Sequence, residues 1–246
     1  MDLYKLTKTK LDEVKNIPFK LEKEIQSLVE ENLQTIFGLE FVKSEFQLNG
    51  LRIDTLGFDE QTKSFVIIEY KKGKSYSVID QGYSYLSLLL NNKADFILEY
   101  LERTNKSLKK GDVDWSQSRV LFVSPQYTLY QKQSIEFKDL PFELWEIKKY
   151  SNDTIILNQH KSTSQESVKT IDSKDNRAEQ VSKEIVVHTE QDHLAKGTDE
   201  TKEIYSELRD RILELDNLEM VPTKFYIGFK LNKRVITDLE IQRKQL

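Results

Sequence analysis

The 246-residue sequence contains no cysteine, which excludes a disulfide framework. It also has no long hydrophobic run: the longest stretches, YLSLLL at 85–90 and FVII at 65–68, are far shorter than the roughly 20 apolar residues that a bilayer crossing requires. The N-terminal segment, MDLYKLTKTKLDEVK, lacks the apolar core of a secretory signal. These absences predict a cytoplasmic protein.

An excess of basic charge is absent as well, since 37 Lys and Arg stand against 41 Asp and Glu and the formal net charge is -4. A tight nucleic-acid binder usually carries a basic field, so this charge argues mildly against one. It argues less against an enzyme, because a site that collects carboxylates for a cation makes its own domain more acidic.

A polar segment divides the chain. Residues 161–184 are rich in Ser, Thr, Lys and acidic residues and show no aromatic residue and no apolar period, which is typical of a linker. We predict a domain over 1–160, a flexible linker over 161–190 and a small α+β accessory domain over 191–246. One helix, capped by Thr198, and two strands bury little apolar surface, so the last segment either leans on the first domain or belongs to a domain that continues beyond this chain.

Hydrophobic periodicity predicts that the first domain is an α/β domain around a mixed sheet. Gly38 stands where the C-cap of the first helix would lie. The turn sequences NG and DEQTK separate the first three strands as in a meander of hairpins. The expected elements are a helix over 19–37, strands over 41–48, 51–58 and 64–72, helices over 77–91 and 93–110, a strand over 119–124, a helix over 127–137 and a hairpin of FELWEIKKY and TIILNQ. In the tail we expect a strand over 224–230.

Three charged residues interrupt the second and third strands: Asp54, Glu69 and Lys71. Side chains alternate along a strand, so Glu69 and Lys71 share a face with Phe65, while Asp54 shares one with Phe58. If Phe58 pairs with Phe65 across the turn, Asp54 lies opposite Glu69 with Cβ atoms roughly 5 Å apart. A slip of one residue would send the two acids to opposite faces.

Two facing carboxylates repel each other, and burying them is costly unless a positive charge lies between them or one of them takes up a proton. A Mg²⁺ or Mn²⁺ ion suits this arrangement, because it accepts one or two carboxylates and leaves room for waters and phosphate oxygens. Lys71 would point to the same side, where an ammonium can hold an attacking water or neutralise charge on a phosphorane-like transition state. The three residues therefore predict a phosphodiester-cleaving site.

Simpler interpretations of the charged stretches stay open. A Glu-x-Lys pattern at a strand end is often a solvated ion pair, and Asp54 could answer Arg52 or Lys71. The stretches KKGK at 71–74 and NKSLKKG at 105–111 could follow a phosphate backbone, although lysine-rich loops are more often only solvated. The histidines of HTEQDH, at 188–193, could bind a metal, but nothing fixes their geometry, so we expect no designed site there.

The αβββαβ order, with RID on one strand and IEYK on the next, resembles the PD-(D/E)xK nuclease superfamily, in particular its RecB-like and mismatch-endonuclease-like members. The resemblance covers about residues 18–125 and departs from the family pattern at Ile53, where the family has Pro. It implies a restriction-endonuclease-like fold. It also implies a metal site built from Asp54, Glu69 and the main-chain carbonyl of Tyr70.

The resemblance extends to residues outside the hairpin. In the family an acid from the first helix joins the metal site, and here Glu24 is preferred over Glu31, which lies on the same flank of the helix. The helix after the Glu-x-Lys strand carries a Gln followed four residues later by a Tyr. Gln81 and Tyr85 match this spacing, stand one helical turn apart and could face the scissile phosphate. Lys71 would position the nucleophile, with Gln81 assisting.

The function that the resemblance implies is that of a Mg²⁺-dependent or Mn²⁺-dependent endonuclease acting on DNA. Two alternatives stay open: a non-catalytic module that binds nucleic acid or protein on a nuclease scaffold, and a structural protein without affinity for cations. DNA is the expected partner, and a homodimer and a protein partner at the C-terminal segment are compatible with the sequence. That segment resembles an uncharacterised bacterial domain sometimes labelled a predicted transport protein, but no span, amphipathic anchor or lipidation motif supports transport.

Overall fold

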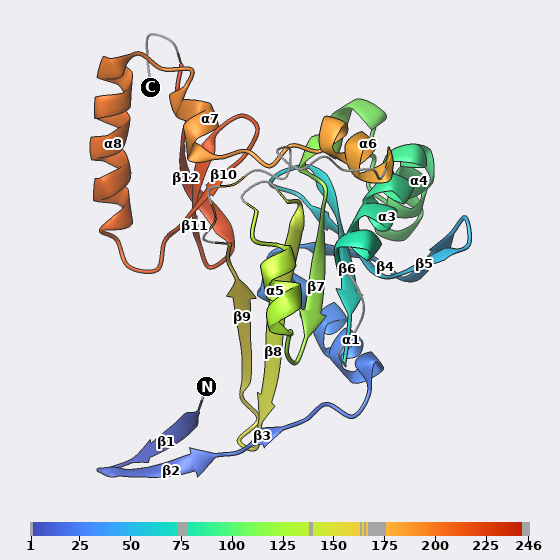
Figure 1. The fold of residues 1–246 in the computed structure, drawn as a ribbon, viewed down its shortest axis with the longest axis vertical. Helices are drawn as coiled ribbons and strands as arrows, with labels where there is room; N and C mark the ends of the chain where they lie inside the picture. Colours follow the sequence, from blue (N-terminus) through green and yellow to red (C-terminus); the bar gives the residue numbers. More distant parts are fainter. Residues whose placement is uncertain are drawn as a thin grey trace.

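The computed structural model describes residues 2–72, 78–137, 140–162, 164, 166 and 176–242. A mixed sheet with helices on both faces forms the body, and a smaller sheet with a long helix lies at one end of it (Figure 1). Near the N-terminus, a hairpin of β1 (Leu3–Thr7) and β2 (Lys10–Val14) extends away from the body (Figure 1). Every helix in the described ranges is too short or too polar to cross a bilayer.

The main sheet, as far as the described residues show it, has seven strands in the order β3-β8-β7-β6-β5-β4, with β9 also paired to β8. Strands β4, β5 and β6 form an antiparallel meander, whereas β6, β7 and β8 run parallel. The mixed α/β class predicted from the sequence is confirmed. The strands are β3 (Asn16–Ile17), β4 (Glu40–Leu48), β5 (Leu51–Asp59), β6 (Ser64–Tyr70), β7 (Arg119–Ser124), β8 (Phe142–Tyr150) and β9 (Ile155–His160).

Helices cover the two faces of this sheet, and each face has its own apolar core (Figure 1). On one face Ile25 and Val29 of the first helix pack against Ile68 of β6. On the other face the crossover helices between β6 and β7 cover Phe65. Because both faces of β6 are covered, all of its residues are buried, Glu69 included. The helices are α1 (Glu22–Glu31), α2 (Leu33–Phe37), α3 (Val78–Asn91), α4 (Lys93–Thr104) and α5 (Leu129–Ser134).

The C-terminal residues have a separate small core, in which Tyr205 of a long helix packs against Phe229 of a three-stranded sheet. The Thr198 hydroxyl caps the long helix by accepting a hydrogen bond from the main-chain N–H of Thr201, as expected. The Gln61 amide of the main domain donates to the carbonyl oxygen of Lys233 at 2.9 Å. The division into two domains stays a prediction. The elements are α7 (Glu190–Leu194), α8 (Asp199–Leu213), β10 (Glu219–Pro222), β11 (Ile227–Leu231) and β12 (Arg234–Leu239).

The predicted elements of the main sheet are all present, but some boundaries differ. The helix predicted over 19–37 is interrupted at Asn32, whose φ of -121° separates α1 from α2. Gly38 closes α2 in the left-handed region with a φ of 71°, as its C-cap position predicted. The strand predicted over 224–230 begins only at Ile227, because the preceding residues form a turn in which the Thr223 N–H donates to the Tyr226 carbonyl.

Part of the predicted flexible linker is helical. Residues Asn176–Glu184 form α6, which lies against α3 (Figure 1). Val181 is fully buried and Ile185 is nearly so, both in the core under α3. The linker prediction is wrong for this stretch, since Ala178, Val181 and Ile185 supply a sparse apolar stripe that becomes sufficient once α3 offers a surface. Residues 167–175 lie outside the described ranges.

Gly82 lies in α3 where this helix crosses Phe142 of β8. A Cβ atom added to Gly82 would lie 2.5 Å from the ring carbon Cε1 of Phe142. The ring has little freedom to move, because Phe142 is 5% exposed and packs edge-on against Tyr83 with ring centroids 5.0 Å apart. The glycine therefore allows α3, which carries Gln81 and Tyr85, to approach the sheet closely.

We expect Gly82→Ala to lower the free energy of unfolding by about 1 kcal/mol, because overpacking a core costs about 1–3 kcal/mol and exceeds the gain of about 1 kcal/mol in helix propensity. Urea denaturation measures this change. Gly111→Ala is the control, since no atom lies within 4 Å of its added Cβ, and it should change stability by less than about 0.5 kcal/mol. Equal effects of the two substitutions would contradict the close approach of α3.

Candidate functional site

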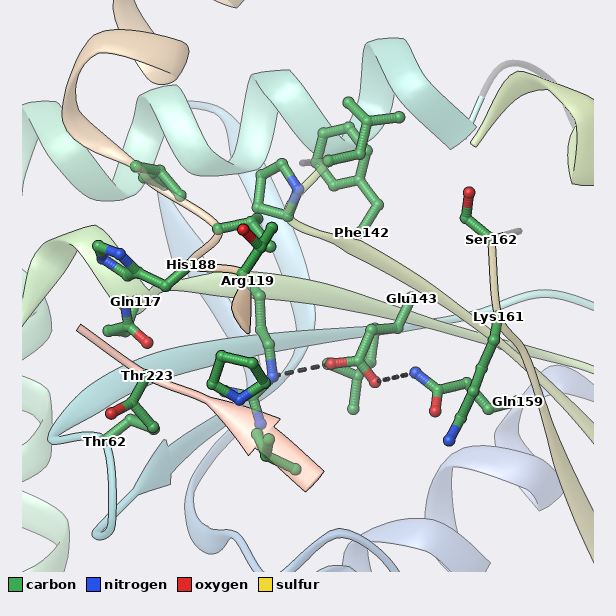
Figure 2. Close-up of a pocket in the computed structure, with 18 of the residues that line it drawn as sticks. Thr62, Gln117, Arg119, Phe142, Glu143, Gln159, Lys161, Ser162, His188 and Thr223 are labelled. Atoms are coloured by element: carbon green, nitrogen blue, oxygen red, sulfur yellow. Dashed lines mark hydrogen bonds and ion pairs between the residues drawn. The ribbon is translucent and has the colours of Figure 1, made fainter. Parts of the chain in front are cut away.

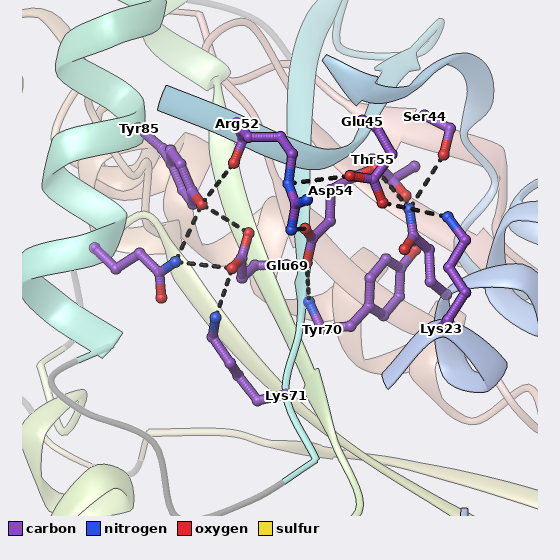
Figure 3. Close-up of polar contacts among 12 residues, drawn as sticks. Lys23, Ser44, Glu45, Arg52, Asp54, Thr55, Glu69, Tyr70, Lys71 and Tyr85 are labelled. Atoms are coloured by element: carbon purple, nitrogen blue, oxygen red, sulfur yellow. Dashed lines mark hydrogen bonds and ion pairs between the residues drawn. The ribbon is translucent and has the colours of Figure 1, made fainter. Parts of the chain in front are cut away.

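The register between β5 and β6 is the one that brings the two acids together. Phe58 pairs with Phe65, and the last pair of the ladder is Thr55 with Ile68. Continuing this register by one residue places Asp54 opposite Glu69. Both acids therefore face the α3 side of the sheet, at the end of the β5–β6 pair (Figure 3).

Glu69 is almost fully enclosed, with only 5% of its side chain exposed. Its Oε1 accepts hydrogen bonds from Lys71 Nζ at 2.6 Å and from Gln81 Nε2 at 2.8 Å. Its Oε2 accepts from the Tyr85 hydroxyl at 2.9 Å, and Gln81 Nε2 also donates to that hydroxyl at 3.1 Å. Figure 3 shows these groups converging on one carboxylate from β6 and α3. The predicted residues Glu69, Lys71, Gln81 and Tyr85 are thus brought together.

Asp54 lies beside this group and has fewer hydrogen-bond donors than Glu69. Its Oδ2 accepts a hydrogen bond from the main-chain N–H of Tyr70 at 3.1 Å, and its Oδ1 lies 3.8 Å from Arg52 Nη2. Burial, followed by repulsion from the Glu69 carboxylate, raises the pKa of Asp54 to about 6, against the opposing effects of the Tyr70 hydrogen bond, Lys71 and Arg52. The negative charges of the two acids are therefore not fully balanced by their neighbours.

A count of charges locates the imbalance. Lys71 has 19% of its side chain exposed and offsets one of the two buried carboxylates. Arg52 contributes less, because its side chain is 59% exposed and its Nε makes a closer ion pair, at 3.0 Å, with Glu45. One negative charge remains in excess at Asp54, whose side chain is 13% exposed.

The donor set matches the small, hard cation predicted from the sequence. Mg²⁺ and Mn²⁺ are held by one or two carboxylates with waters, and Asp54 and Glu69 supply the carboxylates. Among the described residues, no group of three or more His, Cys, Asp and Glu side chains could hold a metal ion, so a cation here would have two side-chain carboxylates as ligands. Tyr70 lies between Glu69 and Lys71 at the end of β6, where its carbonyl belongs to the same strand end.

Helix α1 presents the Gln26 amide to the strand that carries Asp54 and the Glu22 carboxylate to the segment after β6. Gln26 is 4% exposed, and its Nε2 donates to the main-chain carbonyl of Asp54 at 2.9 Å and to Glu30 Oε1 at 2.9 Å. Glu30 Oε1 in turn accepts from the Thr55 hydroxyl at 2.5 Å. One turn before Gln26, Glu22 Oε1 accepts from the main-chain N–H of Lys72 at 2.9 Å. Gln26 and Glu22 were not predicted as members of the site.

Glu24 is not brought to the carboxylate pair. It is exposed, and its Oε2 accepts a hydrogen bond from the main-chain N–H of Lys20 at 2.9 Å, at the start of α1. It stands two positions before Gln26, which places it about 200° around the helix axis from that residue. Glu31, the alternative helix acid, is exposed on the same flank as Glu24. The apolar pair Ile25 and Val29 shows which flank faces the sheet, and that signal favours Glu22 and Gln26 over both acids.

The weaker sequence signals have ordinary explanations where they can be seen. Lys106 of the stretch 105–111 makes ion pairs with Glu40 and Glu60, at 2.7 and 3.3 Å. Part of the stretch 71–74 lies outside the described residues. His193 is buried and its Nε2 lies 2.7 Å from the carbonyl oxygen of Thr223, so it supports the fold of the C-terminal segment.

Comparison with known proteins identifies a relative over the full length of the chain. The sequence is 47% identical to an uncharacterised protein of Haemophilus influenzae in an alignment of 248 positions, which covers 100% of this chain and 82% of the relative. The chain belongs to the family of that protein. No family model matches it.

Similarities to solved structures are partial. EndoMS in its apo form is 20% identical with a TM-score of 0.32, over 55% of this chain and 60% of that one. A repair endonuclease from Pyrococcus abyssi is 19% identical with a TM-score of 0.29, over 49% and 44% of the two chains. SfsA of Pyrococcus furiosus, in complex with Ca²⁺, is 13% identical with a TM-score of 0.28, over 55% and 62%. The chain spans less than two thirds of each, and likeness at this level carries no argument about the site.

We expect Asp54→Asn to raise the free energy of unfolding at pH 8 by about 2 kcal/mol in the absence of divalent cations. The pKa of about 6 in the folded protein exceeds the value of about 3.9 in an unfolded chain, so the folded state retains a proton that the unfolded state has lost. Wild-type stability therefore falls as the pH rises through this window, and the variant, which has no charge at this position, avoids that loss.

Urea denaturation of both proteins between pH 4 and pH 8 measures this difference, which should shrink towards zero at pH 4. Asp216→Asn, at an exposed position after α8, is the matched control and should stay within about 0.5 kcal/mol of the wild type at every pH. A difference between Asp54→Asn and the wild type that does not depend on pH would contradict the raised pKa.

Proposed function

We propose that this protein is a metal-dependent endonuclease that hydrolyses phosphodiester bonds in DNA. The observation that carries the proposal is the buried pair of Asp54 and Glu69, with one surplus negative charge and an ammonium 2.6 Å from one of the acids. A carboxylate pair that is only partly neutralised is costly to bury, and such a cost is commonly retained where it serves chemistry. The choice of DNA rests on the resemblance of the RID and IEYK segments to PD-(D/E)xK nucleases.

In this proposal Asp54, Glu69 and the main-chain carbonyl of Tyr70 hold the cation. When bound, Mg²⁺ or Mn²⁺ would polarise a phosphoryl oxygen and make a bound water more acidic. Asp54 would lose its proton more readily near such a charge, so the site would work with both acids ionised.

Lys71 positions the nucleophile. Its side chain is more exposed than that of Glu69, so its ammonium stands between the buried carboxylate and the solvent from which the substrate arrives. There it can donate to the attacking water and offset negative charge on the pentacoordinate phosphorus. Gln81 and Tyr85 act through Glu69: they hold its two oxygens with hydrogen bonds from α3 and fix the orientation of the carboxylate.

Glu24 has no part in the proposed site, because its carboxylate accepts a hydrogen bond from the main-chain N–H of Lys20, just before α1. The amide of Gln26 holds the strand that carries Asp54 by donating to its main-chain carbonyl. The resemblance implied an acid from this helix at the metal site. An amide in that place favours the second candidate function, a module that binds nucleic acid or protein on a nuclease scaffold without cleaving it. A homodimer, a protein partner at the C-terminal segment and a cytoplasmic location stay predictions.

Incubation of the purified protein with Mg²⁺ or Mn²⁺ and single-stranded, duplex or branched DNA tests the proposal. We expect the wild type to cleave at least one of these substrates. Lys71→Ala should reduce the rate at least 100-fold, within the usual range of about 10²–10⁴ for a positioned catalytic group. Lys183→Ala, an exposed lysine of α6, is the matched control and should retain the wild-type rate.

A second matched pair tests the placement of the acids. Glu69→Gln should abolish cleavage, whereas Glu24→Gln should stay within about threefold of the wild type, because its carboxylate contacts Lys20 rather than the site. Equal cleavage by the wild type and Lys71→Ala would remove Lys71 from the mechanism. Binding of DNA without cleavage under any of these conditions would favour the non-catalytic module.

A further inference from the structure

A second site lies far from the carboxylate pair. A cavity of about 700 Å³ opens between the main sheet, the segment around α7 and the C-terminal sheet (Figure 2). Arg119, the first residue of β7, stands at its centre and pairs in the sheet with Val66, whereas Glu69 pairs with Phe122 further along the parallel strands. The cavity and the proposed nuclease site are therefore at opposite ends of β6 and β7. Ligand pockets commonly enclose about 300–1,000 Å³, so the volume suits a small molecule.

Two polar atoms at the wall of this cavity lack partners in the described part of the chain. One is the hydroxyl oxygen of Ser118, a residue that is 1% exposed, and the other is Nε2 of His188. Burial lowers the pKa of His188, so its ring is neutral near pH 7. Buried polar groups in folded proteins are almost always hydrogen-bonded, so two unpaired atoms beside one cavity are unusual.

The charged side chains that line the cavity carry one net positive charge, since four cations stand against three carboxylates: Arg119, Lys161, Lys230 and Lys233 against Asp59, Glu143 and Glu219. Arg119 is matched by Asp59 at 3.1 Å and by Glu143 at 2.9 Å. Lys161 and Lys233 both lie near Glu219, at 3.7 and 3.9 Å, respectively. The fourth cation takes part in none of these ion pairs.

That cation is Lys230 of β11, which lines the same cavity. In the described ranges no carboxylate oxygen lies within 4.0 Å of its ammonium group, although Asp59 and Glu143 act on it from further away. Burial lowers the pKa of Lys230, as expected for a cation without a close counter-ion. A single negative charge brought into the cavity would complete this set.

The rest of the wall is apolar and aromatic. Apolar residues of the main sheet and of β10 line this cavity, among them Leu121, Met220 and Val221. The Trp145 ring also lines the cavity, and its Nε1 donates to Glu143 at 2.8 Å. Phe37 packs edge-on with ring centroids 5.0 Å apart, and the Lys233 ammonium lies 5.4 Å from the ring centroid. A ligand that fills this space needs an apolar or aromatic body as well as a charge.

We propose that this cavity binds a small organic anion whose negatively charged group meets Lys230 and whose apolar or aromatic body lies against the part of the wall that includes Trp145. This site is independent of the proposed nuclease activity, since Asp54, Glu69 and Lys71 do not line the cavity.

The dye 8-anilinonaphthalene-1-sulfonate, an aromatic molecule with one negative charge, is the probe. Added to the full-length protein, it should bind one to one with a rise in its fluorescence. Lys230→Met should weaken the binding at least tenfold, and Lys230→Arg, which keeps the charge, should stay within about threefold of the wild type. Lys202→Met, at a lysine of α8 that pairs on the surface with Asp199, is the matched control and should stay within about twofold.

Energy transfer from tryptophan locates the dye. Trp145 lines the cavity and Trp115 does not, so Trp145→Phe should remove more than half of the dye emission excited through tryptophan. This measurement remains decisive if Lys230→Met fails to fold. An undiminished transfer in Trp145→Phe, or equal affinity in Lys230→Met and the wild type, would overturn the proposal.

Competition then separates two kinds of anion. AMP carries a planar base and a phosphate, whereas decanoate carries an aliphatic chain and a carboxylate. Displacement of the dye by either supports the proposal, and the stronger competitor identifies the body that the cavity prefers. Displacement by neither would overturn it.

Discussion

Repulsion between the Asp54 and Glu69 carboxylates is the constraint around which the site is built. Both acids lie on adjacent strands where little water reaches them, and Lys71 offsets only one of the two charges. The protein supports Glu69 fully, with three donors, and leaves Asp54 with a single main-chain hydrogen bond and a raised pKa. The unequal support makes Asp54 the place where an additional positive charge has the largest effect.

Packing on both faces of β6 holds the two charges close together. β6 lies in the middle of the sheet with cores on both faces, so a charge at its end is buried unless the neighbouring elements leave an opening. Helix α3 can bring its donors to Glu69 because Gly82 allows it to pack closely on Phe142. On the other face α1 holds the Asp54 strand through Gln26. The position of the acids is thus set by packing on both sides of one strand.

Much of this arrangement follows from local sequence. The turn between β5 and β6 and the pairing of Phe58 with Phe65 determine the register, and the one-turn spacing of Gln81 and Tyr85 places both on the same face of α3. The rotation of α1 does not follow as directly. The apolar pair Ile25 and Val29 indicates the flank that faces the sheet, and packing on the sheet then brings Glu22 and Gln26, rather than Glu24, towards the site.

Features that depend on contacts between distant segments were harder to predict from the sequence. Helix α6 has too few apolar residues to be recognised alone, and its burial depends on a surface offered by α3. The cavity is lined by residues as distant in the sequence as Ser118, His188 and Lys230, so no local sequence pattern predicts it. Features that arise from packing between distant segments cannot be predicted from a short stretch of sequence.

We propose that a divalent cation balances the charge of the Asp54 and Glu69 pair, and electron paramagnetic resonance at pH 8 can count bound Mn²⁺ directly. We expect one bound ion per chain, binding at least tenfold weaker in Asp54→Asn, and unchanged binding in Glu24→Gln. Absence of bound Mn²⁺ in the wild type, or equal binding by Asp54→Asn, would contradict it.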